Sequence, residues 1–299
     1  PDYEPYLTLL GAAEASDDIF AVSAYCPITN LEHADMAYEW LFNGVNDYEQ
    51  TMMPGTMPSP GGHAVISQEA RPKVKGTLTE EQKRASGELK RHFTGYLNGL
   101  KLEGGGATLT LDADGNGSFK DYVGSWVIAS AQRAMDQGTD LSALEWLTVR
   151  DGKVTAVDFE AYIRYVGRMK TAPAFDAPDL STGENELFGT QSVKAQHFTR
   201  FGQDHDTAGG ALAESAIVKM LNPMNYIGLE GVTPARHWRI RHGAVDSDTS
   251  LAVPVILATV LDKAGLDVNF AVPWGQGHGG DYDLDELFDW IRSVCAEGR

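Results

Sequence analysis

The sequence predicts an α/β protein with a parallel sheet and a large, mainly helical insertion. Short apolar stretches that have the character of buried strands alternate with helical stretches at both ends of the chain, in residues 6–26 and 238–294. Close alternation of strand and helix is typical of βαβ units, which build parallel sheets. Residues 63–222 between them have a mostly helical hydrophobic pattern. The predicted order along the chain is therefore core, insertion, core.

The composition is that of an acidic globular protein. The 299 residues contain 24 Lys and Arg against 42 Asp and Glu, which gives a formal net charge of −18, and 42% of them are hydrophobic. Such acidity argues against nucleic acid or an anionic membrane surface as the main partner. No apolar run approaches the roughly 18 residues of a transmembrane helix. We therefore expect a soluble protein with no nucleic-acid and no membrane partner.

Neither the start of the chain nor its cysteines fix the cellular compartment. The sequence opens at Pro1 without an initiator Met or a signal-like segment, so we expect the gene product to begin further upstream. Cys26 and Cys295 match no metal or redox spacing, and two free thiols are preferred to a disulfide. A secreted or periplasmic location is slightly preferred to a cytoplasmic one.

The first 52 residues are predicted to form part of the α/β core. A helix is expected at residues 6–15. Residues 19–26 are short, continuously apolar and bounded by turn residues, as a strand buried on both faces should be. Residues 53–62 then supply three prolines and three glycines, which indicates a domain boundary.

Residues 53–222 are predicted to be an inserted domain made mainly of helices. Thr79 and Gln82 form a capping-box pair ahead of a helical pattern that continues to Leu100. Further helices are expected at residues 122–135, 157–169 and 212–221.

Residues 223–299 return to the α/β pattern and are predicted to complete the core. The expected elements are a strand at 238–241, a helix at 249–263, a strand at 268–272 and a helix at 284–294. This order again predicts parallel strands joined by a helix.

Asp246 and His278 follow the two predicted strands of this last segment, 32 residues apart. The carboxyl ends of parallel strands meet at one edge of a sheet, where open α/β sheets bind ligands. In a hydrolytic triad, a carboxylate fixes the tautomer of an imidazole. Asp246 and His278 are suited to be these two members, and they follow the chain order used by α/β-hydrolases. The alternative is that Asp246 caps the following helix and that His278 is an ordinary loop residue.

The nucleophile of such a triad is missing from the sequence. A Gly-x-Ser-x-Gly turn, which carries the nucleophile in α/β-hydrolases, occurs nowhere in the chain. The helix and strand expected in residues 6–26 are the two elements that normally follow this turn. We therefore expect the sequence to begin just after it.

A short acidic loop invites comparison with calcium sites. Residues 112–118 (DADGNGS) reproduce the first half of an EF-hand loop, but the twelfth position is Val123 where a Glu belongs. Residues 108–111 alternate like a strand, so a hairpin turned through residues 115–117 is the alternative. We expect no metal site and no cofactor.

Two long segments resemble the bacterial tannases. They are residues 24–40 (AYCPITNLEHADMAYEW) and residues 238–249 (WRIRHGAVDSDT), the second followed by Pro273-Trp274, His278 and residues 281–284 (DYDL). The resemblance runs over essentially the whole chain. It implies the C-terminal part of an α/β-hydrolase core that carries a large inserted lid, and a serine esterase that hydrolyses galloyl esters.

The resemblance also implies roles for five residues. Asp246 is the triad acid and His278 the triad base. Lys170 and Glu184 in the lid, with Asp248, fall where the family reads the hydroxyls of the galloyl ring. Carboxylates accept hydrogen bonds from hydroxyls and an ammonium donates one, so the chemistry is suitable. Without the resemblance, Lys170 is explained as a charge at a helix C-terminus, Glu184 as a solvated loop residue and Asp248 as a helix-start residue.

The family's nucleophilic Ser would lie about ten residues before Pro1. We therefore expect a complementary N-terminal polypeptide to supply that Ser and the oxyanion donors, with small-molecule galloyl esters as the other partner. The alternatives are a feruloyl-type esterase or a peptidase of the same fold, and a non-catalytic binding homologue.

Overall fold

The computed structural model of the protein describes residues 4–16, 18–51 and 73–297. The predicted domain boundary at residues 53–62 lies outside the described residues. The α/β class is confirmed, because the centre of the molecule is a parallel sheet with the strand order β1-β8-β9. Its strands are β1 (Ala21–Tyr25), β8 (His237–Arg241) and β9 (Asp267–Ala271).

The three strands end at the same edge of the sheet. Tyr25, the last residue of β1, pairs with Arg241, and Arg241 pairs with Ala271 at the end of β9. The segments that follow the strands therefore leave the sheet side by side. Only one edge of β1 has a partner strand in the part of the chain that the structure describes.

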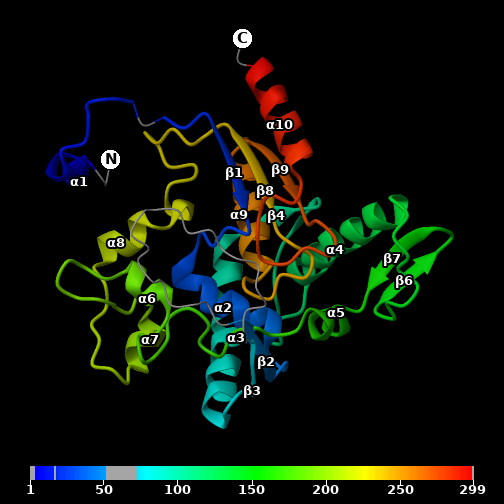
Figure 1. The fold of residues 1–299 in the computed structure, drawn as a ribbon, viewed down its shortest axis with the longest axis horizontal. Coiled ribbons are helices and arrows are strands. Elements are labelled where there is room, and N and C mark those ends of the chain that lie inside the picture. Colours follow the sequence, from blue (N-terminus) through cyan, green and yellow to red (C-terminus); the bar gives the residue numbers. More distant parts are fainter. Residues whose placement is uncertain (1–3, 17, 52–72, 298–299) are drawn as a thin grey trace.

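A long helix packs against the sheet, and an ionic cluster lies directly before the last helix of the chain. In α9 (Ala252–Lys263), Leu257 and Leu261 pack against Ile240 of β8. The other helices before β2 and after β9 are α1 (Glu4–Leu10), α2 (Leu31–Phe42) and α10 (Leu284–Glu297), and α2 contacts α9. The side chains of α1 are all exposed, and Figure 1 shows this helix apart from the sheet. Directly before α10, the Asp283 carboxylate pairs with the buried Arg239 guanidinium and with Arg241.

The remaining elements lie between β1 and β8 in sequence. Figure 1 shows α6, α7 and α8 together on one side of α2 and the β6–β7 hairpin on the other. Their bounds are β2 (Asp47–Thr51), β3 (Lys73–Thr77), α3 (Glu80–Leu100), β4 (Glu103–Gly104), β5 (Ala107–Thr108), α4 (Ser118–Asp136), β6 (Leu147–Arg150), β7 (Lys153–Val157), α5 (Phe159–Val166), α6 (Gly183–Leu187), α7 (Arg200–Asp204), α8 (Ser215–Met220) and the 3-10 turn η1 (Pro223–Asn225).

Local signals predict the long helices of this segment well. The capping box at the start of α3 is present, since Gln82 N–H donates to the Thr79 hydroxyl and the Gln82 side chain accepts from Thr79 N–H. The expectation of a mainly helical segment misses three antiparallel hairpins, β2–β3, β4–β5 and β6–β7. The helix expected at 157–169 is wrong at both ends, because β7 reaches Val157 and α5 ends at Val166.

The acidic loop at residues 112–118 does not form the hairpin that was the alternative to calcium. It leads directly from the short β5 into α4. Asp112 Oδ1 accepts the backbone N–H groups of Asp114 and Asn116, so this carboxylate organises its own turn. Among the described residues, no helix is both long and apolar enough to cross a membrane.

A buried ionic cluster holds the segment around α6 and α7 together. His197 lies between two carboxylates, with Nδ1 2.7 Å from Asp176 Oδ1 and Nε2 3.0 Å from Asp206 Oδ1. Asp176 Oδ2 also accepts from the backbone N–H and the hydroxyl of Thr199. Burial alone lowers the pKa of His197, but the two carboxylates outweigh burial and raise this pKa above its usual value.

We expect this cluster to make the stability of the protein depend on pH. Because the folded pKa of His197 is raised, its contribution is complete below the unfolded pKa of about 6.5 and is lost as pH rises through the folded pKa. The free energy of unfolding, measured by urea denaturation at a series of pH values, should therefore fall above pH ~6.5. His197→Gln should remove this part of the slope.

His205→Gln is the matched control, since His205 is an exposed histidine at the end of α7. Its pH profile should follow that of the unchanged protein. Equal slopes for the His197 variant and the unchanged protein would contradict the assignment.

Candidate active site

The loops after β8 and β9 meet because a glycine lets their backbones touch. Ala244 N–H donates to Pro273 O (2.9 Å), and Val245 N–H donates to Gln276 O (2.9 Å). A Cβ at Gly243 would overlap the carbonyl oxygens of Gln276 and Gly277. The Gly in the sequence His-Gly-Ala-Val-Asp is therefore what allows Asp246 to approach the loop that carries His278.

Asp246 and His278 are hydrogen bonded. His278 Nδ1 lies 3.0 Å from Asp246 Oδ2, which is on a carboxylate that is fully buried. The other oxygen, Oδ1, accepts from the backbone N–H groups of Asp248 (2.8 Å) and Thr249 (3.1 Å). The alternative that Asp246 only caps the next helix is wrong, since α9 begins at Ala252.

The two groups shift each other's pKa in opposite directions. Burial alone would raise the pKa of Asp246, but the rings of His242 and His278 and a backbone N–H lower it to about 2. The Asp246 carboxylate, helped by the Cys26 thiol, raises the pKa of His278 to about 10 against the effect of burial. In this arrangement the Asp246 carboxylate is ionised, and the His278 ring is the imidazolium, with both nitrogens protonated. His278 is also the open side of the pair, with 41% of its side chain exposed.

The three residues expected to read a galloyl ring lie together beside this pair. Lys170 Nζ is 3.0 Å from Asp248 Oδ1 and 3.9 Å from Glu184 Oε1, and it lies over the Phe175 ring, 4.0 Å from its centroid. Asp248 Oδ1 is also 3.8 Å from His278 Nδ1. A cation, two carboxylates and an aromatic face thus adjoin the Asp246–His278 pair.

Lys170 is placed by backbone contacts and does not end a helix. It lies four residues beyond the end of α5, so the helix C-terminus does not explain its charge. The hydroxyl of the fully buried Tyr38 accepts from the backbone N–H of Lys170 (3.0 Å) and donates to Ser247 O (2.8 Å). Next to it, Arg168 forms a buried ion pair with Glu39 and donates through Nε to Lys170 O (2.6 Å).

Glu184 lies in the first turn of the short helix α6. The Thr182 hydroxyl accepts from Asn185 N–H at the start of this helix. The buried Asn185 side chain donates to Asp176 Oδ1 (2.8 Å), which connects α6 to the ionic cluster of His197. Glu184 itself is only partly buried, with 25% of its side chain exposed, so its carboxylate is accessible.

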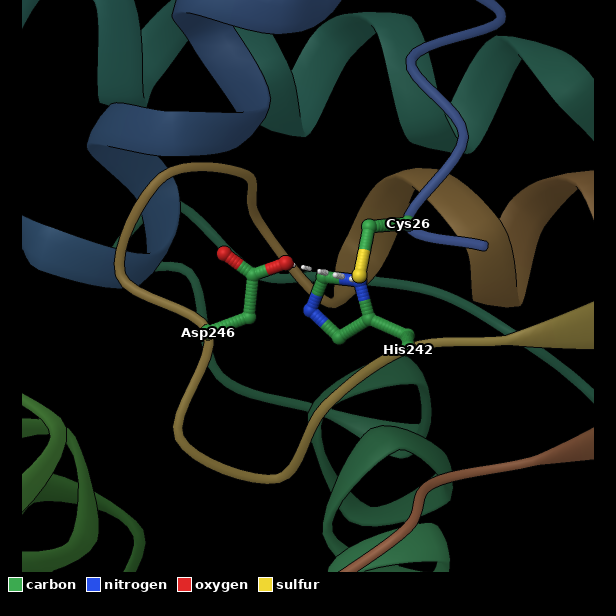
Figure 2. A group of neighbouring side chains, drawn as sticks. All are labelled: Cys26, His242 and Asp246. Carbon is green, nitrogen blue, oxygen red and sulfur yellow. Dashed lines mark ion pairs between the residues drawn. The ribbon is translucent and has the colours of Figure 1, made fainter. Parts of the chain in front are cut away.

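Two residues beside the pair were not predicted from the sequence. Cys26 directly follows β1, and His242 directly follows β8. Their side chains lie with Asp246 in a buried group whose possible ligand atoms are all within 4.8 Å of one another (Figure 2). Neither was assigned a role from the sequence, since Cys26 was expected only to be a free thiol and His242 received no prediction. Their positions after two strands were the available signal, because parallel strand ends converge.

Comparison with known proteins gives matches among solved structures. No protein-family model matches the chain, and no curated protein sequence matches it. Tannin acyl hydrolase from Lactobacillus plantarum is 48% identical with a TM-score of 0.89, over 98% of this chain and 60% of that chain. For Fusobacterium nucleatum tannase the identity is 48% and the TM-score 0.90, over 98% of this chain and 62% of that chain.

A third match is a structure of tannin acyl hydrolase in complex with ethyl gallate. It is 47% identical with a TM-score of 0.87, over 98% of this chain and 60% of that chain. The present chain therefore spans about three fifths of the length of the tannases that it matches. The resemblance to the bacterial tannases that the sequence predicts is confirmed by solved structures that share this fold over 98% of the chain.

Proposed function

We propose that these 299 residues are the lid-bearing, triad-completing part of a serine esterase that hydrolyses galloyl esters of tannins and simple gallates. Residues 1–52 and 223–299 form its α/β-hydrolase core, and residues 53–222 form its lid. One observation carries the proposal. The loop of Asp246 and Asp248 joins the hydrogen-bonded Asp246–His278 pair to a polar cluster, which consists of Lys170, Glu184 and Asp248. The match to a tannin acyl hydrolase solved with ethyl gallate supports the substrate class.

In the proposed reaction His278 is the general base. Asp246 holds its Nδ1, which leaves Nε2 to take the proton of the nucleophilic Ser. The Ser oxygen attacks the galloyl carbonyl, and the alcohol leaves with the proton that His278 returns. Water then attacks the acyl-enzyme by the same steps, releasing gallate and restoring the Ser. Asp246 keeps the ring oriented and stabilises the imidazolium in both halves.

We assign the nucleophilic Ser and the oxyanion donors to a complementary N-terminal part. The chain spans only about 60% of the matched tannases, and His278 is the exposed member of its pair. A segment that covers His278 also solves a chemical requirement. Burial disfavours the protonated ring and so lowers the pKa from about 10 towards the near-neutral value that suits a general base.

The polar cluster explains a preference for a ring with several hydroxyls. A galloyl ring carries three adjacent hydroxyls, so it can donate to Asp248 and Glu184 and accept from Lys170. A feruloyl ring has a methoxy group in place of a donor, and an unsubstituted ring offers no polar partner at all. Such rings would leave the charged groups unpaired once water is excluded, which costs binding free energy. The cluster therefore favours galloyl over feruloyl or benzoyl esters.

The reaction is tested by combining residues 1–299 with the N-terminal part of a matched tannase that they do not cover, either fused or co-expressed. Residues 1–299 alone should not hydrolyse methyl gallate, and the combined protein should. In the combined protein His278→Ala should lower kcat by about a thousandfold or more while binding of gallate changes little, because a triad member acts mainly in the transition state.

His205→Ala in the lid is the control and should leave kcat unchanged. Hydrolysis by residues 1–299 alone would contradict the assignment of the nucleophile. An active combined protein that tolerates His278→Ala would contradict the triad, and binding of gallate without turnover would favour a non-catalytic homologue.

Ring recognition is tested in the same combined protein with Lys170→Ala and Glu184→Ala. Each lost charge-assisted hydrogen bond is worth about 1.5–3 kcal/mol, so kcat/KM for methyl gallate should fall roughly ten- to a hundredfold. The same variants should leave hydrolysis of methyl benzoate nearly unchanged, since that ring has no hydroxyl to lose.

Lys194→Ala and Glu186→Ala provide matched controls, because these residues form an exposed ion pair close by, 2.8 Å long. Neither should alter the ratio between the two esters. An equal loss on both esters in the Lys170 variant would mean that the residue supports the lid and does not read the ring.

A further inference from the structure

Three potential metal ligands from different parts of the chain meet behind the Asp246–His278 pair. Cys26 follows β1, His242 follows β8, and Asp246 lies four residues further on. Cys26 Sγ, a ring nitrogen of His242 and a carboxylate oxygen of Asp246 all lie within 4.8 Å of one another. Figure 2 shows the three side chains directed toward one another. All three residues are buried.

His242 is the unexplained member of this group. Its side chain is 1% exposed, yet neither ring nitrogen has a hydrogen-bond partner among the described residues. Burying an imidazole nitrogen without a partner costs free energy, so such a group in a folded protein requires an explanation. The reaction proposed above gives His242 no task, because His278 holds the hydrogen bond to Asp246. An ion bound by the ring would supply a partner for one of these two nitrogens.

The donor set suits zinc or a similar thiophilic cation. Thiolate, imidazole and carboxylate are its usual protein ligands, with bond lengths of about 2.0–2.3 Å. Such bonds place neighbouring donors roughly 3–4 Å apart. His242 Nδ1 and Asp246 Oδ2 are already 3.6 Å apart, and no pair of donor atoms in the group is more than 4.8 Å apart. A doubly charged ion also neutralises the two anionic ligands in a buried place.

We propose that Cys26, His242 and Asp246 form a binding site for Zn²⁺, and that occupation of this site excludes the esterase reaction. Three protein ligands leave a fourth tetrahedral position for water. The exclusion rests on the proposed function and on one atom. Asp246 Oδ1 already accepts two backbone N–H groups, whereas Oδ2 faces His242 Nδ1 at 3.6 Å, so Oδ2 is the oxygen available to the ion. The same Oδ2 is the acceptor for His278 Nδ1. With that oxygen on a doubly charged ion, the carboxylate is a weaker acceptor for His278 and no longer stabilises the imidazolium that forms in the reaction.

Metal binding is tested on residues 1–299 without any assay of activity, with Co²⁺ as the spectroscopic probe. Metal-free protein titrated with Co²⁺ should develop a thiolate-to-cobalt charge-transfer band that saturates at one ion per chain and disappears when Zn²⁺ is added. Cys26→Ser should abolish the band. His242→Asn should weaken Co²⁺ binding by about tenfold or more, as expected for loss of one ligand.

Cys295→Ser is the matched control, since Cys295 is the other free cysteine and lies exposed on α10. It should keep both the band and the affinity, and unchanged circular dichroism of all variants should show that each is folded. Absence of a band in the unchanged protein would overturn the site. A band that survives Cys26→Ser, or one that is lost in Cys295→Ser, would overturn it as well.

Exclusion is tested separately in the combined esterase. Zn²⁺ should inhibit methyl gallate hydrolysis, and a chelator should restore it. The inhibition constant of Zn²⁺ should rise about tenfold or more in Cys26→Ser. Each rate is compared with the zinc-free rate of the same variant. Co²⁺ binding at the site without inhibition would overturn the exclusion alone. If His278→Ala left kcat unchanged while Co²⁺ still bound at the site, the proposed reaction would be overturned and the metal site would stand.

Discussion

The hydroxyl of Tyr38 is the contact on which the arrangement of the site depends. It donates to Ser247 O and accepts from the backbone N–H groups of Met169 and Lys170, so a single buried oxygen joins the loop of Asp246 to the segment that carries Lys170. Burial raises the pKa of Tyr38 well above its ordinary value, which keeps the hydroxyl a neutral donor. Each partner left unpaired in the interior would cost about 1–3 kcal/mol. The distance between Lys170 and Asp248 is therefore set by the fold and not by their own ion pair, whose side chains are partly exposed.

The segment that carries Lys170 and Phe175 is held in place by polar groups as much as by apolar packing. One carboxylate, that of Asp35 on α2, accepts the backbone N–H groups of Ala174, Phe175 and Asp176, which places the Phe175 ring under Lys170. Breaking a buried ion pair such as Arg168–Glu39 would leave a charge in the interior without a partner, at a cost of about 3–5 kcal/mol. Such contacts have strict geometry, whereas apolar side chains tolerate sliding. This explains how residues on short helices and irregular backbone can be held near the Asp246–His278 pair.

The parts of the site that the sequence predicts are those that follow from strand polarity and local signals. Asp246 and His278 come after consecutive parallel strands, and the capping box at Thr79 needs only neighbouring residues. The β6–β7 hairpin was missed although its turn, Asp151-Gly152 with φ angles of 49° and 72°, carries a recognisable hairpin signal. Cys26 was missed for a different reason. Its contact with His242 depends on β1 lying next to β8, and hydrophobic periodicity does not specify the order of strands in a sheet.

The Asp246 carboxylate has three sets of partners, namely the backbone of its own loop, His278 and His242. Its Oδ1 is used up in shaping the loop, since it accepts from the N–H groups of Asp248 and Thr249. Only Oδ2 remains for any second partner, and the rings of His278 and His242 lie 3.0 and 3.6 Å from it. Because an ion or proton bound to Oδ2 on the buried side withdraws negative charge from the carboxylate, it weakens the hydrogen bond to His278. The buried side of the site, at His242, and the exposed side, at His278, are therefore coupled through Asp246 Oδ2, without any movement of the backbone.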